Sequence, residues 1–150
     1  MILILASGAA ALAAATPIHS AEITHASNAY TASYQTASTI HVREVESRFA
    51  NRPSVPVCRW QAELVVNRAV AAQGRPIAAV AKSIHRFAPL SGSHAGKCTA
   101  ARSQIEAEVA RYSVAQSVHA TAIAQQDRAV LVNELDGIQA LSRKGAVTGG

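Results

Sequence analysis

The chain has 150 residues and a mass of 15.6 kDa, and its formal charge is +5 at pH 7 because 14 Lys and Arg residues outnumber 9 Asp and Glu residues. This length fits one domain and excludes a large enzyme domain. Aromatic residues make up only 4% of the chain, which argues against a carbohydrate-stacking cleft or a platform for single-stranded nucleic acid, since both rely on exposed rings.

The N-terminus carries an uncharged apolar run, Ile2 to Ala15, followed by a short polar stretch that ends at Ala21. This pattern is typical of a secretory signal peptide, although no Lys or Arg precedes the run. Fourteen residues are fewer than the roughly 20 that a transmembrane helix needs. We therefore assign residues 1–21 to a signal peptide and expect the protein to be periplasmic or secreted. The alternative is a buried N-terminal helix.

Two cleavage sites are compatible with the small residues that signal peptidases require. Cleavage after Ala15 would place Ala13 three residues before the cut. Cleavage after Ala21 would place His19 at that position, which is unfavourable. Both sites remain open on the sequence alone.

The chain contains two cysteines, Cys58 and Cys98. An exported protein meets an oxidising compartment, so the sequence predicts a disulfide between them. Closing a loop of this length stabilises a fold by about 4 kcal/mol in the chain-entropy model. The alternative is a catalytic or metal-binding thiolate.

Residues 22–38 consist mainly of Ser, Thr, Ala, Asn and Tyr without apolar periodicity, which predicts a flexible leader. The single small domain is expected to span residues 39–142. Three glycines between 142 and 150 predict a flexible tail over 143–150.

Three segments of this domain favour β-strands. Thr39–Val45 alternates in part, and Cys58–Asn67 has a clear period of two that puts Trp60 and Leu64 on the inward face. Ile77–Phe87 is ambiguous between a strand and a helix, and we assign it to a strand. Turn residues over 89–97 indicate a loop.

Cys98–Leu135 contains neither Pro nor Gly and predicts a long helix. The polar cluster around Asp127 suggests a kink, with Asp127 capping a second helix. The expected fold is therefore α+β: a small antiparallel sheet of about three strands packed on a long or kinked C-terminal helix, with one disulfide. An all-α fold is the alternative, if residues 60–72 and 76–88 are helical.

Positive charge is concentrated in residues 48–102, which contain nine basic residues and a single acid, Glu63. Such a segment favours anionic partners. A coding bias is the alternative explanation, since Arg outnumbers Lys by 11 to 3. The expected anion contacts are Arg59, Arg68, Arg75, Lys82 and Arg86.

Candidate chemistry is sparse, because no phosphate-binding loop, hydrolase elbow or metal motif is present. We expect no cofactor. The sequence favours a non-enzymatic binding or structural role, with an anionic envelope polymer or an acidic protein as the partner, no specific nucleic acid, and no stable transmembrane segment after cleavage. The alternative is a metal-binding protein or a small enzyme that uses His41, His85 and His94. The sequence does not indicate the oligomeric state.

Overall fold

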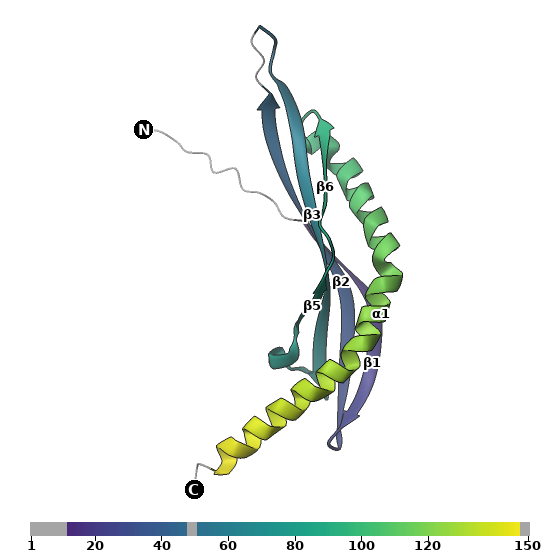
Figure 1. Cartoon of the computed structure of the whole chain (residues 1–150), viewed down its shortest axis with the longest axis vertical. Helices are drawn as coiled ribbons and strands as arrows, with labels where there is room; N and C mark the ends of the chain where they lie inside the picture. Colours follow the sequence, from purple (N-terminus) through teal and green to yellow (C-terminus); the bar gives the residue numbers. More distant parts are fainter. Residues whose placement is uncertain (1–11, 48–50, 148–150) are drawn as a thin grey trace, which may run out of the picture. The chain divides into compact units, whose positions relative to one another are not determined.

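The computed structural model describes residues 12–47 and 51–147 (Figure 1). It confirms the α+β class: an antiparallel sheet is combined with one long C-terminal helix and one disulfide. The sheet has six strands, twice the expected number. The elements in chain order are β1 (Leu12–His25), β2 (Asn28–Ser47), β3 (Val55–Ala72), β4 (Arg75–Pro76), η1 (Ala78–Val80), β5 (Lys82–Arg86), β6 (Leu90–Ala95) and α1 (Cys98–Val147).

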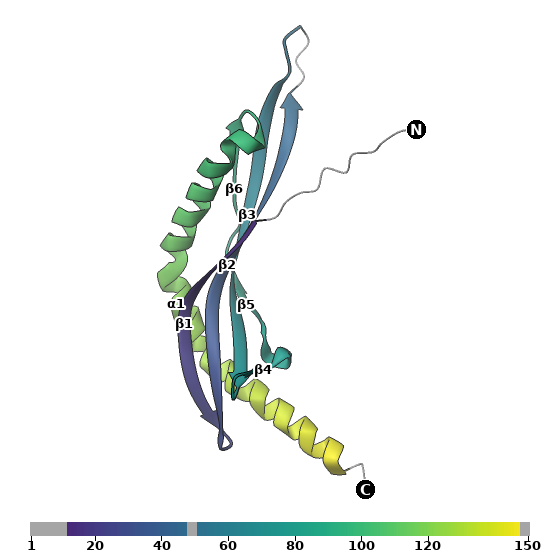
Figure 2. The same ribbon diagram turned by 180° about the vertical axis from the view of Figure 1, so that it is seen from behind.

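Strand β3 is the central strand of the sheet, because four of the other five strands pair with it directly. Its first neighbour is β2, which pairs in turn with β1. Its second edge pairs with three short strands in succession: residues 57–62 pair with β6, 65–68 with β5 and 71–72 with β4 (Figure 2). The predicted strand over 58–67 is therefore confirmed and forms the middle of a longer one.

The chain divides into two compact units, each with its own hydrophobic core. Unit 1 comprises residues 1–14, 38–64 and 87–115, and unit 2 comprises residues 15–37, 65–86 and 116–150. Each core is built between one face of the sheet and a stretch of α1, as the pattern of alternating buried residues along β3 requires.

The core of unit 1 joins Cys58, Trp60 and Ala62 of β3 to helix residues that include Ala101 and Ile105. These helix residues are four apart and so lie on one face of α1. Strand β6, where the sequence predicted a loop, pairs with β3 so that Gly92 lies opposite Trp60. A Cβ at Gly92 would come within 2.8 Å of the indole, so a glycine is needed at this position to make room for Trp60.

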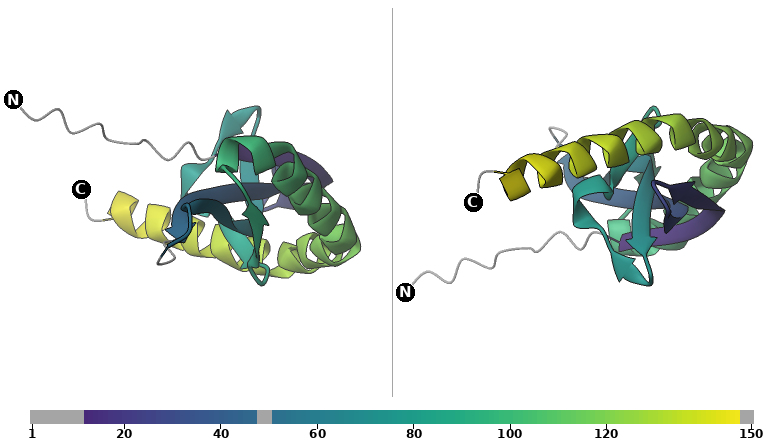
Figure 3. Two further views of the ribbon diagram at one scale, coloured as in Figure 1. Left: turned by 90° about the horizontal axis from the view of Figure 1, so that it is seen from above. Right: turned by 90° about the horizontal axis from the view of Figure 1, so that it is seen from below.

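The core of unit 2 contains Ile23 of β1, three residues of β2, Val70 and Val80, and the helix residues Ala124, Leu131 and Leu135. The residues from β2 are Tyr30, Ala32 and Tyr34. Figure 3 shows the later part of α1 running over the strands of this unit. The expected flexible leader over 22–38 is therefore wrong: these residues form the hairpin of β1 and β2, and every second residue from 30 to 36 is buried.

Helix α1 runs without interruption for 50 residues. Asp127 is buried within it, with an exposed fraction of 8%, so the prediction that Asp127 caps a second helix is wrong. Residues 143–147 of the predicted flexible tail are helical, while 148–150 lie outside the described residues. No helix among the described residues is both long and apolar enough to cross a membrane.

Two further predicted segments can be located in the structure. The ambiguous segment 77–87 contains the short helix η1 followed by strand β5. The expected signal peptide overlaps β1, because residues 12–21 lie in that strand, while residues 1–11 lie outside the described residues.

Candidate functional site

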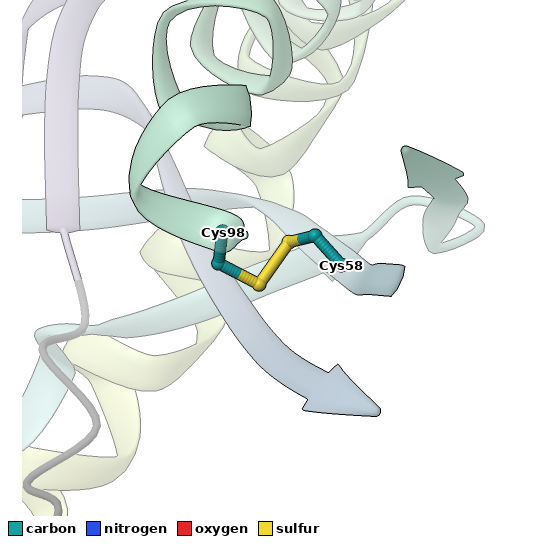
Figure 4. The surroundings of a disulfide bond; sticks show 2 residues. All are labelled: Cys58 and Cys98. Carbon is teal, nitrogen blue, oxygen red and sulfur yellow. A yellow bond between two sulfur atoms is a disulfide. The ribbon is translucent and has the colours of Figure 1, made fainter. Parts of the chain in front are cut away.

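The disulfide lies in unit 1, where it fastens the first residue of α1 to strand β3. Cys58 and Cys98 are bonded, with their Cα atoms 4.8 Å apart (Figure 4). Cys58 is fully buried and belongs to the core of the unit. The predicted bridge is therefore confirmed, and a disulfide-bonded sulfur is neither a nucleophile nor a metal ligand.

In unit 2, an arginine occupies the inward face of β3. The side chain of Arg68 is 0% exposed, and its alternation with Leu64, Val66 and Val70 directs it into the core. Its Nε donates a hydrogen bond to the carbonyl of Val80 at 2.9 Å. A buried guanidinium is tolerated only when opposite charges and hydrogen bonds compensate for its lost hydration.

Two acids of α1 supply this compensation. Arg68 Nη1 donates to Asp127 Oδ2 at 2.8 Å, and Nη2 bonds to Glu134. The Tyr34 hydroxyl donates to the same Asp127 oxygen at 3.0 Å, and Lys82 pairs with Glu134. We call Tyr34, Arg68, Lys82, Asp127 and Glu134 the Arg68 cluster.

The electrostatics of the cluster follow from burial and pairing. Burial and then the negative charge of Asp127 raise the pKa of the Tyr34 hydroxyl, which stays protonated as a donor. Burial alone would raise the pKa of Glu134, but hydrogen bonds from Lys82 and Arg68 outweigh it and lower that pKa. For the cation Arg68 the directions are reversed: burial lowers the pKa of the guanidinium, but its bonds to Asp127 and Glu134 outweigh burial and raise that pKa. Arg68 and Glu134 are therefore held in their ionised forms.

The other predicted anion contacts are dispersed. Arg59 is exposed on β3 in unit 1, whereas Arg75, Lys82 and Arg86 are exposed on β4 and β5 in unit 2. Arg68 is wrong as a surface contact, because its position on the inward face buries it. The structure thus brings three of the five predicted residues to exposed positions of one unit.

An open groove of about 530 Å³ lies beside the Arg68 cluster in unit 2. One wall comes from η1 and the start of β5, including Val80 and Lys82, and the other comes from α1, including Ile138, Leu141 and Lys144. Leu141 is 72% exposed. The groove combines apolar walls with two lysines and the carboxylate of Glu134.

The histidines predicted for the alternative function are divided between the two units. His41 and His94 belong to unit 1, and His85 belongs to unit 2. His94 Nε2 lies 3.0 Å from Glu108 Oε1 without hydrogen-bond geometry, and the ring of His85 lies 5.8 Å from that of His119. Within the described residues, no group of three or more His, Cys, Asp or Glu side chains gathers in a way that could hold a metal ion.

Comparison of the chain with protein-family models, with curated proteins and with solved structures finds no match in any of the three.

Proposed function

We propose that the chain is an exported protein of the periplasm or the extracellular space, and that it has a non-enzymatic binding role. Its partner is an anionic envelope polymer, which contacts the exposed cations of unit 2. The observation that carries this proposal is the exposure of three predicted anion contacts in one unit, Arg75 on β4 and Lys82 and Arg86 on β5.

The charge of this stretch is unbalanced along the sequence. Residues 64–105 contain six basic residues and no Asp or Glu. In unit 2, Asp127 and Glu134 of α1 pair with Arg68 and Lys82 of this stretch. The charges of Arg68 and Lys82 are thereby balanced by two acids, and the exposed Arg75 adds positive charge on β4, which attracts polyanions.

The disulfide supports export. Such bonds form and persist in oxidising compartments and are rare where thiols are kept reduced. Cys58 lies in the core of unit 1, so the bond is part of the folded structure. Intact mass of protein recovered from the exported fraction, before and after reduction and alkylation, tests this point; free thiols in that fraction would contradict it.

The binding proposal predicts that the double variant Arg75→Glu and Arg86→Glu loses affinity for a sulfated polysaccharide, heparin, at least tenfold. Each basic residue near an anionic surface contributes about 1 kcal/mol, and reversal adds repulsion. The measurement is titration calorimetry at two salt concentrations, because the attraction must weaken as salt screens it.

The matched control is the double variant Arg128→Glu and Arg143→Glu, which changes the net charge equally on exposed positions of α1 in the same unit. We expect it to bind nearly as well as the parent protein. Equal losses for both variants would mean that net charge alone drives the binding, and unchanged affinity of the first variant would overturn the proposed surface.

A further inference from the structure

We propose that signal peptidase cleaves the chain after Ala15, so that the mature protein begins at Thr16. The inference rests on the export proposed above and chooses between the two cleavage sites that the sequence leaves open. It is carried by the contacts that residues 16–25 make in unit 2.

These residues are the part of β1 that completes the core of unit 2. Ile23 is only 2% exposed, and Ile18 packs against the same core. The carbonyl of Thr16 accepts a hydrogen bond from Thr36 Oγ1 at 3.4 Å. The ring of His19 lies 5.8 Å from that of Tyr34, which donates to Asp127 in the Arg68 cluster.

Cleavage after Ala21 would remove most of this strand. Only residues 22–25 of β1 would stay, and the contacts of Thr16, Ile18 and His19 would be lost. Strand β2 would then become the edge of the sheet along most of unit 2, and an unprotected edge invites pairing with other chains. The core of unit 2 would then keep Ile23 but lose Ile18, and Tyr34 would lose its ring contact with His19.

Cleavage after Ala15 avoids these losses. It leaves residues 16–25 of the fourteen-residue strand in place. The cut falls one residue beyond the division between the segments 1–14 and 15–37 of the two units. It also meets the requirement of the peptidase for small residues, since Ala13 and Ala15 occupy the third and first positions before the cut.

The test is to express the full precursor in a secreting bacterial host, purify the exported fraction and determine its N-terminus by mass spectrometry. We expect Thr16 as the first residue. A mature chain beginning at Glu22 would overturn the inferred site while leaving export intact. Full-length protein in the exported fraction would also overturn the site, whereas full-length protein confined to the cytoplasm would overturn the export proposal as well.

Two single variants locate the site independently of the stability of the product. Ala15→Lys places a long charged side chain next to the cut and should reduce processing at least tenfold, measured as the ratio of precursor to mature protein in a pulse-chase experiment. Ala14→Lys introduces the same side chain at the tolerated middle position and should be processed like the parent. Unimpaired processing of Ala15→Lys to a mature chain that begins at Glu22 would contradict the inference.

Discussion

Arg68 is a charged residue at a position where the strand pattern requires an inward side chain. Residues 64, 66, 68 and 70 of β3 are all buried, and three of them are apolar. The fold accommodates the fourth because Asp127 and Glu134 approach it from α1 and Val80 offers a carbonyl. The guanidinium therefore joins β3, the end of η1 and the helix within unit 2.

Replacement of Arg68 by Met should destabilise the protein by about 3–5 kcal/mol, because the buried Asp127 would lose its opposite charge. Urea unfolding followed by circular dichroism measures the change. The matched control, Arg128→Met, alters an exposed arginine of α1 in the same unit and should shift stability by no more than about 0.5 kcal/mol. Equal stability of the Arg68 and Arg128 variants would show that the Arg68 cluster contributes nothing net.

The Arg68 cluster could be predicted only in part from the sequence. The period of two that identified β3 also places Arg68 on the inward face with Leu64 and Val66, so its burial was available as a signal. Its partners were not, since Asp127 lies 59 residues further along the chain and Glu134 lies 66 residues further. Pairing over such distances depends on the tertiary fold, which periodicity does not report.

At the scale of elements, strands with large apolar side chains were predictable and strands with small or polar ones were not. Strand β3 shows its alternation through Trp60, Leu64 and Val66. The inward residues of β2 are instead Tyr, Ala, Tyr and Thr, a set that resembles a polar leader until Tyr30 and Tyr34 are seen in the core. Strand β6 was missed because Ser and Gly normally indicate a loop, whereas here Gly92 makes room for the indole of Trp60.

The hairpin of β1 and β2 can be tested at its turn. Ala26 and Ser27 both have positive φ, at 47° and 65°, in the region that favours Gly and Asn. The double variant Ala26→Asn and Ser27→Gly should stabilise the protein by about 1 kcal/mol, because both new residues adopt positive φ with less strain. The readout is the midpoint of thermal unfolding.

The second hairpin supplies the matched control for this change. Gly74, with φ of 76°, follows Gln73 between the paired residues Ala72 and Arg75. Gly74→Ala should destabilise the protein by about 1 kcal/mol, the opposite sign. A loss of stability in the double variant at positions 26 and 27 would mean that the first turn depends on contacts of the native side chains.

For the whole molecule, the class of fold followed from the sequence because the helix, the strand over 58–67 and the cysteine pair are strong signals. The number of strands did not, since β4, β5 and β6 are short and the buried residues of β2 include no Leu, Ile or Val. The disulfide closes a sequence separation of 40 residues. The bond restricts residues 58–98 in the unfolded chain and so lowers the entropy of the unfolded state.

Reduction of the disulfide should therefore lower the free energy of unfolding by about 4 kcal/mol. Urea unfolding with and without a phosphine reductant measures this difference. The double variant Cys58→Ala and Cys98→Ala is the control, because it should be insensitive to the reductant. A reductant effect of the same size in that variant would assign the destabilisation to something other than the bond.

The Arg68 cluster also has a consequence for the timing of folding. Tyr34 and Asp127 are 93 residues apart, so the cluster can assemble only after most of the chain has been released. Contacts of such high sequence separation form slowly, because the closure entropy of the intervening loop must be overcome first. In the proposed export, in which the N-terminus would cross first, Arg68 would emerge before Asp127 and Glu134 and would stay hydrated until they follow. The hairpin of β1 and β2 would also lack its cover until the later part of α1 has crossed. In the proposed export, the chain would be most open to proteolysis and aggregation between the emergence of this hairpin and the arrival of α1.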